Sequence, residues 1–182
     1  MIFPLFRRER RGGDTISALY GMIVAQARLP CFYRDYAVPD TVNGRFDLIA
    51  LHLILVLERM SGEPALQALG QGIFDRFWRD MDHNLREMGV GDLAVPKRML
   101  DLGEAFYGRS RAYRAAWADA DDVALTAALQ RNVYDEAAGA GAAARLAAYS
   151  RDALRGLQAQ SAARLAAGAI NFPEPDKILP PM

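Results

Sequence analysis

The feature that most constrains this chain is the stretch of residues 74–97, in which a two-faced helix runs into a helix-breaking turn. Apolar residues recur there at steps of three and four, the spacing of one face of an α-helix. They are Phe74, Phe77, Trp78, Met81, Leu85 and Met88. The opposite face is almost wholly charged, and Gly89, Gly91 and Pro96 are suited to end this helix and open the next one. We therefore expect two helices joined by a short turn, with the apolar stripe facing a core.

Helical spacing also dominates the rest of the chain, and no strand-like alternation or internal repeat is evident. We expect helices over 14–28, 46–60, 64–88, 96–107, a short stretch around 113–117, 123–133, and one or two from 142 to about 167. The sequence thus predicts an all-α protein, a single globular bundle of about six to eight helices with short irregular termini. We place an apolar and basic tail at 1–13, the helical domain at 14–170 and a Pro-rich tail at 171–182.

Length and charge restrict the functional classes. The chain has 182 residues, enough for one domain with a core, and a formal net charge of zero. A general nucleic-acid binder needs a basic excess, so we expect no direct binding of nucleic acid. The only cysteine, Cys31, rules out an internal disulfide and fits a reducing compartment. No apolar run reaches the roughly 18 residues of a membrane span.

The first residues suggest weak contact with a membrane. Phe3 and Phe6 lie beside Arg7 and Arg8, without the charge order of a secretory signal. Apolar side chains in the acyl boundary and arginines on anionic headgroups would give reversible binding. The alternative is a frayed tail that packs back on the domain. We expect a bacterial cytoplasmic protein, peripheral to the inner membrane if this contact forms.

Residues for metal or nucleophilic chemistry are few. Asp80 and His83 form one Asp-x-x-His pair, whereas a carboxylate-bridged metal site in a bundle needs several such ligands. The other histidine, His52, lies in an apolar helix and is expected to be a hydrogen-bonded core residue. No G-x-S-x-G motif occurs. We expect no cofactor, no metal and no catalytic residue.

Two further stretches admit a binding role. The turn GVGDLAVPK fails the phosphate-loop pattern, but Lys97 lies in the first turn of a helix, where the dipole disfavours a cation. A partner carboxylate is therefore expected, either Asp92 or a group on another protein. In 105–117, arginines alternate with aromatic residues, which suits a partner surface. The plainer interpretation places Phe106, Tyr113 and Trp117 in the core and the arginines at the surface.

Four blocks of sequence, in order over about half the chain, resemble a known family. They read YGMIVAQARLPCFY (20–33), VPDTVNGRFDLIALH (38–52), FWRDMDHNLREMGVGDLAVPK (77–97) and AFYGRSRAY (105–113). The family is the ubiquinol–cytochrome c chaperones, assembly factors of the cytochrome bc1 complex. In mitochondria its members are associated with the ribosome's tunnel exit, receive newly made cytochrome b and act with a small partner protein.

The resemblance implies that this chain, as a bacterial member, is a non-enzymatic chaperone that binds cytochrome b. A chaperone for a membrane protein needs an apolar groove and a charged rim. The polar residues inside the matching blocks are candidates for that rim: Arg45, Asp47, Asp82, Arg86, Glu87, Asp92, Lys97, Tyr107 and Arg109. Two alternatives stay open. One is an all-α binding protein for a small apolar ligand such as a quinone or lipid, with an enclosed cavity beside 48–57. The other is an enzyme with a helical metal site.

Overall fold

The most apolar helix of the chain lies at the centre of the molecule. A computed structural model describes residues 3–134 and 140–178, with the side chains of 12–134 and 141–178. In it, α3 (Val42–Met60) is buried almost all round. Thr41 caps its first turn, because its hydroxyl oxygen accepts the Gly44 N–H at 3.1 Å. A helix apolar on every face has to be covered on every face, which dictates the arrangement around α3.

Seven further α-helices accompany α3 in the described ranges. They are α1 (Phe3–Ala27), α2 (Pro30–Arg34), α4 (Gln67–Glu87), α5 (Val95–Ala118), α6 (Val123–Val133), α7 (Ala140–Gln158) and α8 (Ala162–Ala166). Two 3-10 turns, η1 (Pro64–Leu66) and η2 (Pro175–Lys177), complete the set, and these ranges contain no strand. Helices α1, α4, α5, α6 and α7 all contact α3. The predicted all-α bundle of six to eight helices is confirmed.

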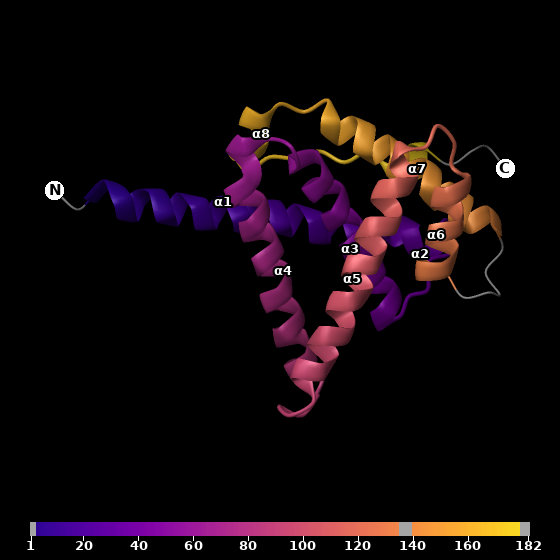
Figure 1. The fold of residues 1–182 in the computed structure, drawn as a ribbon, viewed down its shortest axis with the longest axis horizontal. Helices are drawn as coiled ribbons and strands as arrows, with labels where there is room; N and C mark the ends of the chain where they lie inside the picture. The colour runs from indigo at the N-terminus through magenta and orange to yellow at the C-terminus, as the bar shows by residue number, and fades with distance from the viewer. Residues whose placement is uncertain (1–2, 135–139, 179–182) are drawn as a thin grey trace.

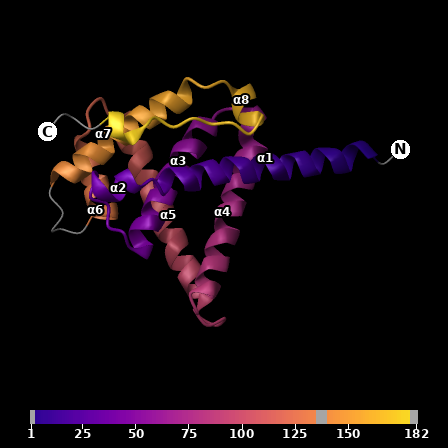
Figure 2. The same cartoon turned by 180° about the vertical axis from the view of Figure 1, so that it is seen from behind.

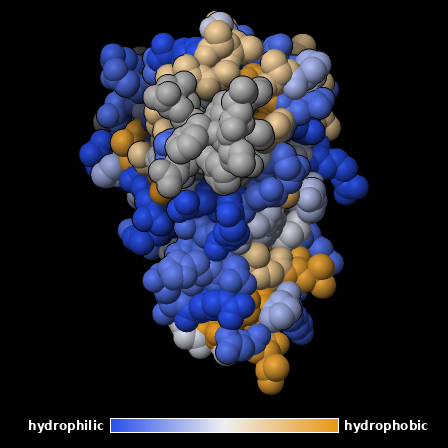
Figure 3. All heavy atoms as spheres, turned by 90° about the vertical axis from the view of Figure 1, so that its left-hand side faces the viewer, coloured by the Kyte–Doolittle hydropathy of each residue, from blue (hydrophilic) through white to orange (hydrophobic). Residues whose placement is uncertain are grey.

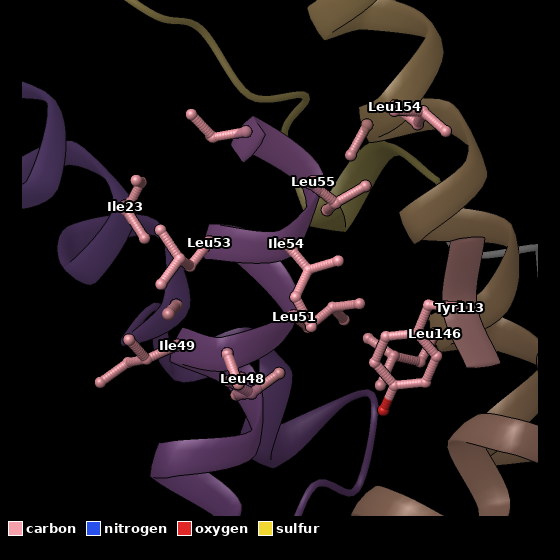
Figure 4. Packing of buried hydrophobic residues seen from close by; sticks show 14 of the residues in the cluster. Ile23, Leu48, Ile49, Leu51, Leu53, Ile54, Leu55, Tyr113, Leu146 and Leu154 are labelled. Carbon is pink, nitrogen blue, oxygen red and sulfur yellow. The ribbon is translucent and has the colours of Figure 1, made fainter. Parts of the chain in front are cut away.

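The core is filled by side chains around α3. Figure 4 shows Leu48, Leu51 and Ile54 of α3 among residues from neighbouring helices, with Ile23 of α1 on one side and Leu146 of α7 on the other. Most of these side chains are wholly excluded from solvent. The small-ligand alternative needed an enclosed apolar cavity at this place. The side chains described around 48–56 belong to one cluster of buried residues that pack against the neighbouring helices.

Helices α4 and α5 form a hairpin that tapers away from the body. Figures 1 and 2 show the two helices converging on the turn between them at one extremity of the molecule. The predicted start of α5 at Pro96 is confirmed, since Pro96 lies in its first turn. The predicted end at Gly108 is wrong, because α5 continues without a break to Ala118. The cost of one glycine inside a helix is smaller than the gain from burying Tyr113 and Trp117 on its far side.

The two ends of the chain also differ from expectation. Helix α1 begins at Phe3 and not at residue 14, so the backbone of 3–13 is helical where an irregular tail was expected. Pro4 fits the first turn of a helix, and arginines favour helix, so a helical start is physically reasonable. Figures 1 and 2 show this part of α1 extending beyond the body. At the other end, the alanine-rich region divides at 159–161, where Ser161 caps α8, and not at Gly156.

Candidate functional site

The nine candidate rim residues fall into two groups. Asp47 and Arg109 line a pocket between α3, α5 and the end of α6, and Arg45 lies just outside it, between the lining residues Gly44 and Phe46. Asp82, Arg86, Glu87, Asp92 and Lys97 lie on the turn between α4 and α5, which we call the hairpin tip and define as residues 82–100. Tyr107 lies apart from both groups on α5, with its ring against Phe74 and Phe106. The structure therefore offers two surfaces and not one continuous rim.

A buried ion pair forms the floor of the pocket. Arg109 Nη2 lies 2.7 Å from Asp47 Oδ1, and the two side chains are 16% and 7% exposed. The same guanidinium donates to the backbone oxygen of Asn132 at 3.2 Å and lies over the Phe46 ring, 5.8 Å from its centroid. Arg109 was expected at the surface, and this is a correction. Its side chain ties α3, α5 and the end of α6 together.

Two polar atoms in this pocket lack a hydrogen-bond partner within the described part of the chain. They are Arg109 Nε and Asp47 Oδ1, and the second of these is held by the ion pair with Arg109 at 2.7 Å. Burial raises the pKa of Asp47 to about 6, because desolvation of the carboxylate outweighs the attraction of Arg109.

The wall of the pocket depends on one glycine. The space of about 480 Å³ is lined by Pro39, Gly44, Phe46 and Leu102, with Arg131 and Asn132 at the side of α6. A Cβ on Gly44 would lie 2.0 Å from the Pro39 carbonyl oxygen, so only glycine allows the preceding loop to approach α3 this closely. Arg45 lies outside this wall and donates to Asp40 at 2.7 Å on the surface.

At the hairpin tip, Arg86 forms ion pairs with two carboxylates. It lies 2.8 Å from Asp82 and 2.7 Å from Asp92, and it holds the pKa of Asp82 below its usual range through a side-chain hydrogen bond. His83 lies 3.1 Å from Glu87, one helical turn away. The predicted pairing of Asp92 with Lys97 is wrong, because Asp92 turns back toward α4. Lys97 is exposed and forms no ion pair with any residue that the structure describes.

Apolar residues at this tip were not expected. Met88 was assigned to the buried stripe of the central stretch, yet it is 53% exposed. Leu100 is 63% exposed and Leu93 is fully exposed. The earlier part of the stripe is buried as predicted, with Phe77 and Met81 inside. A leucine between two glycines and a proline was the signal in the sequence, since such a turn has no core to bury it.

The histidine predicted for the core is there. His52 is fully buried, and its ring nitrogens lie 2.8 Å from the Leu48 carbonyl oxygen and from the Tyr149 hydroxyl. Phe106, Tyr113 and Trp117 are also buried, as predicted. Within the described side chains, no three histidine, cysteine or acidic residues lie close enough to hold a metal ion.

The N-terminal membrane candidates belong to the first turns of α1. The backbone of Phe3, Phe6, Arg7 and Arg8 belongs to α1, and their side chains lie outside the described set. Membrane contact there stays a prediction. None of the helices in 3–134 and 140–178 combines the length and apolar character needed to cross a bilayer.

Comparisons with known proteins agree on one family. Residues 34–172 match the family described as ubiquinol-cytochrome C chaperone. The crystal structure of the Cbp3 homolog from Brucella abortus has a TM-score of 0.88 and 45% sequence identity to this chain, covering 97% of this chain and 99% of that one.

Two curated vertebrate relatives are also similar. The ubiquinol-cytochrome-c reductase complex assembly factor 1 of Xenopus laevis is 29% identical over 106 residues, 58% of this chain and 52% of the frog protein. Its Mus musculus counterpart is 29% identical over 119 residues, 65% of this chain and 40% of the mouse protein. The chain spans about half the length, or less, of these two relatives. By the residues it matches and the fold it shares, the chain belongs to the ubiquinol–cytochrome c chaperone family.

Proposed function

We propose that this chain is a non-enzymatic assembly chaperone that binds newly made cytochrome b and assists assembly of the cytochrome bc1 complex. The observation that carries the proposal is the family match over 34–172, supported by the shared fold of the Cbp3 homolog. The relatives from frog and mouse are named as assembly factors of ubiquinol–cytochrome c reductase. An assembly factor acts through binding surfaces, and the two groups of polar residues supply them.

The chemistry of the two groups suits an unassembled membrane protein. Such a client exposes apolar segments joined by polar loops, and it has backbone amides without partners. The pocket at Asp47 and Arg109 places a buried ion pair next to the Phe46 ring. The hairpin tip offers a charged network beside exposed Met88 and Leu93. Mixed surfaces of this kind fit segments that are only partly apolar.

Further partners follow from the same relationship. We propose that the chain acts in the bacterial cytoplasm, peripheral to the inner membrane, as expected from the resemblance and from residues 1–13. Contact with the ribosome and with a small partner protein, as in mitochondrial relatives, belongs to the same proposal. No binding of nucleic acid is included, because the chain has no basic excess.

The direct test is capture of the client in the native host. The tagged chain is crosslinked gently, membranes are solubilised, and the bound proteins are identified. Cytochrome b enriched above other membrane proteins is the expected result. Recovery of no bc1 subunit, in cells that express the complex, would contradict the proposed function.

A pair of charge reversals tests the hairpin tip as part of the client surface. Arg86→Glu together with Lys97→Glu should lower cytochrome b recovery several-fold, because both changes reverse a charge facing the partner. The matched control is Arg155→Glu with Lys177→Glu, two exposed residues with ion pairs elsewhere on the surface. Normal capture by the first variant, with intact helical circular dichroism, would show that the tip does not hold the client.

A further inference from the structure

One face of α5 carries a helix-packing pattern that is largely open to solvent. Its members recur at steps of three and four along the helix: Leu100, Gly103, Tyr107, Ser110 and Arg114. We call these five residues the α5 seam. Leu100 and Tyr107 are 63% and 62% exposed, although this spacing is the one through which helices pack against each other. Figure 3 shows hydrophobic residues gathered toward the lower end of the molecule, where the hairpin lies.

The seam borders a pocket between the two helices of the hairpin. Figures 1 and 2 show α4 and α5 diverging from the tip toward the body. Where they lie apart there is a pocket of about 400 Å³, and Tyr107 and Arg114 of the seam are among the residues that line it. Leu57 and Met60 at the end of α3 and Phe74 of α4 give it apolar walls. A bulky apolar side chain from a partner can therefore enter beside the seam.

The charges of this surface favour an uncharged partner. Among the described residues that line the pocket, Arg114 alone is charged, and Glu58 pairs with it at 2.6 Å. Beside the seam, the exposed charges of α5 alternate in sign through Lys97, Glu104 and Arg111. A helix with charged flanks would need a run of one opposite sign along the seam to be recognised. An apolar helix without charges does not.

The small members of the seam allow a close approach. Gly103 and Ser110 alternate with the larger residues, and a Cβ on Gly103 would meet nothing within 4 Å. Small residues at such positions let two helix backbones come close together, which is how helices of membrane proteins pack. From Leu100 to Arg114 the seam runs for about 21 Å, at 1.5 Å per residue. A membrane-spanning helix is about 30 Å long, so the seam can hold roughly two thirds of one.

A second copy of the chain offers little that fits the seam. Outside the hairpin, the exposed large apolar residues of the described part of the chain are Val42 and Val123. They are single side chains at the starts of two different helices, α3 and α6. Neither forms an apolar helix face, so one copy could present only its own hairpin to another.

We propose that the α5 seam and the adjoining pocket hold one uncharged apolar helix of the membrane-protein client. The identity of this client rests on the proposed function. The helix lies along the seam with its backbone close to Gly103, and one bulky apolar side chain enters the pocket beside Phe74 and Tyr107. The polar loops of the client contact the hairpin tip and the pocket at Asp47 and Arg109.

A matched pair of substitutions tests the seam. Gly103→Glu and Gly108→Glu make the same change in the same helix, and a Cβ meets nothing within 4 Å at either position. Gly103 belongs to the seam, whereas Gly108 is exposed and lies about 100° around the helix from Tyr107. Gly103→Glu should lower cytochrome b recovery from the native host about tenfold, because an apolar helix would have to desolvate the new carboxylate. Gly108→Glu should leave recovery unchanged.

Photo-crosslinking locates the contact. A benzoylphenylalanine in place of Tyr107 should crosslink to an apolar helical segment of cytochrome b. The same probe in place of Val123, which is 73% exposed at the start of α6, should not. A crosslink from position 107 to a polar loop, to a second copy of this chain or to a soluble protein would overturn the assignment. Equal recovery by Gly103→Glu and Gly108→Glu would do the same.

This contact and the proposed function can fail separately. If the unmodified chain and Gly103→Glu recover cytochrome b equally, the seam is not the site but the proposed function stands. A labelled synthetic helical peptide of leucine and alanine with lysine ends tests the seam without the client. If it binds the unmodified chain and Gly108→Glu but not Gly103→Glu, the seam holds an apolar helix even where no bc1 subunit is recovered. Equal peptide binding by all three chains would show that it does not.

Discussion

At the residue scale, a chain of hydrogen bonds between buried polar side chains links three helices of the core. The Leu48 carbonyl oxygen only accepts, so His52 must carry its proton on Nδ1 and donate it there. Its Nε2 then accepts from the Tyr149 hydroxyl, which in turn accepts from Gln26. This chain of hydrogen bonds joins α1, α3 and α7 in one register. Because it requires a neutral imidazole, it also makes stability depend on pH.

Protonation of His52 should destabilise the fold in mild acid. Burial lowers the pKa of His52 to about 4, against 6.5 for an exposed histidine. Between these two pH values the unfolded chain binds a proton at His52 that the folded chain does not bind. The contribution of His52 to the free energy of unfolding should therefore fall as the pH drops from 6.5 to 4, by ~3 kcal/mol at most. Denaturant titrations at pH 7, 6 and 5 measure this.

The control for that experiment is His52→Gln, which cannot titrate. It should be less stable at pH 7, and the difference in the free energy of unfolding between the two chains should shrink as the pH drops from 6.5 toward 4. Asp47 acts in the opposite sense, since its pKa is raised from 3.8 to about 6, so its ionisation costs stability as the pH rises between these two values. The comparison cancels this contribution, because both chains retain Asp47. Identical slopes in the two chains would rule out His52 as the titrating group.

The sequence indicated which polar residues matter but not which residues they contact. The apolar helix around His52 indicated a core histidine, because polar groups in apolar surroundings are usually hydrogen-bonded. Nothing local indicated Tyr149 as the partner, 97 positions away. Asp47 and Arg109 were both chosen as site candidates, each from its own sequence block. Their ion pair depends on how α3 and α5 pack, which a pattern within one helix does not contain.

At the scale of elements, periodicity predicted helices well and their ends less well. The stripe of α4 and the start of α5 were correct because they rest on spacing and on Pro96. The error at Gly108 arose because glycine was taken as a stop signal. Local propensity is worth about 1 kcal/mol at one position, and the burial of Tyr113 and Trp117 beyond it is worth more.

Gly108 should therefore be replaceable with a gain in stability. A Cβ at this position meets nothing within 4 Å, and its backbone is helical. Gly108→Ala should raise the free energy of unfolding by about 0.5–1 kcal/mol, because alanine restricts the unfolded chain more than glycine does. Thermal or denaturant unfolding followed by circular dichroism measures the change.

Gly44→Ala is the matched control within another helix. Its Cβ would collide with the Pro39 oxygen, so it should lower the free energy of unfolding by roughly 1–3 kcal/mol. The same change from glycine to alanine should therefore raise the free energy of unfolding at position 108 and lower it at position 44. Destabilisation by Gly108→Ala would indicate that α5 is bent or broken there, as the sequence had suggested.

At the scale of the whole molecule, the core is closed by the end of the chain. The Pro-rich tail was expected to be irregular, and apart from η2 its described part is. It nevertheless packs on the bundle. We call residues 170–178 the C-terminal strap. Ile170 is buried, Phe172 lies edge-on to His52, and the backbone oxygens of Pro173 and Pro175 accept from Gln26 and Tyr36. Composition alone did not predict this packing, because prolines exclude regular structure but not burial.

Removing the strap should therefore weaken the entire fold and not only its edge. A chain that ends at residue 169 loses the burial of Ile170 and two hydrogen bonds to the core, together roughly 4 kcal/mol. Tyr36→Phe removes only the bond to Pro175 and should cost about 1 kcal/mol. Denaturant unfolding of the three chains should give this graded order in one cooperative transition, because the strap contacts the same aromatic cluster as His52 and Tyr149. A truncated chain as stable as Tyr36→Phe would mean that the strap rests on a core already complete without it.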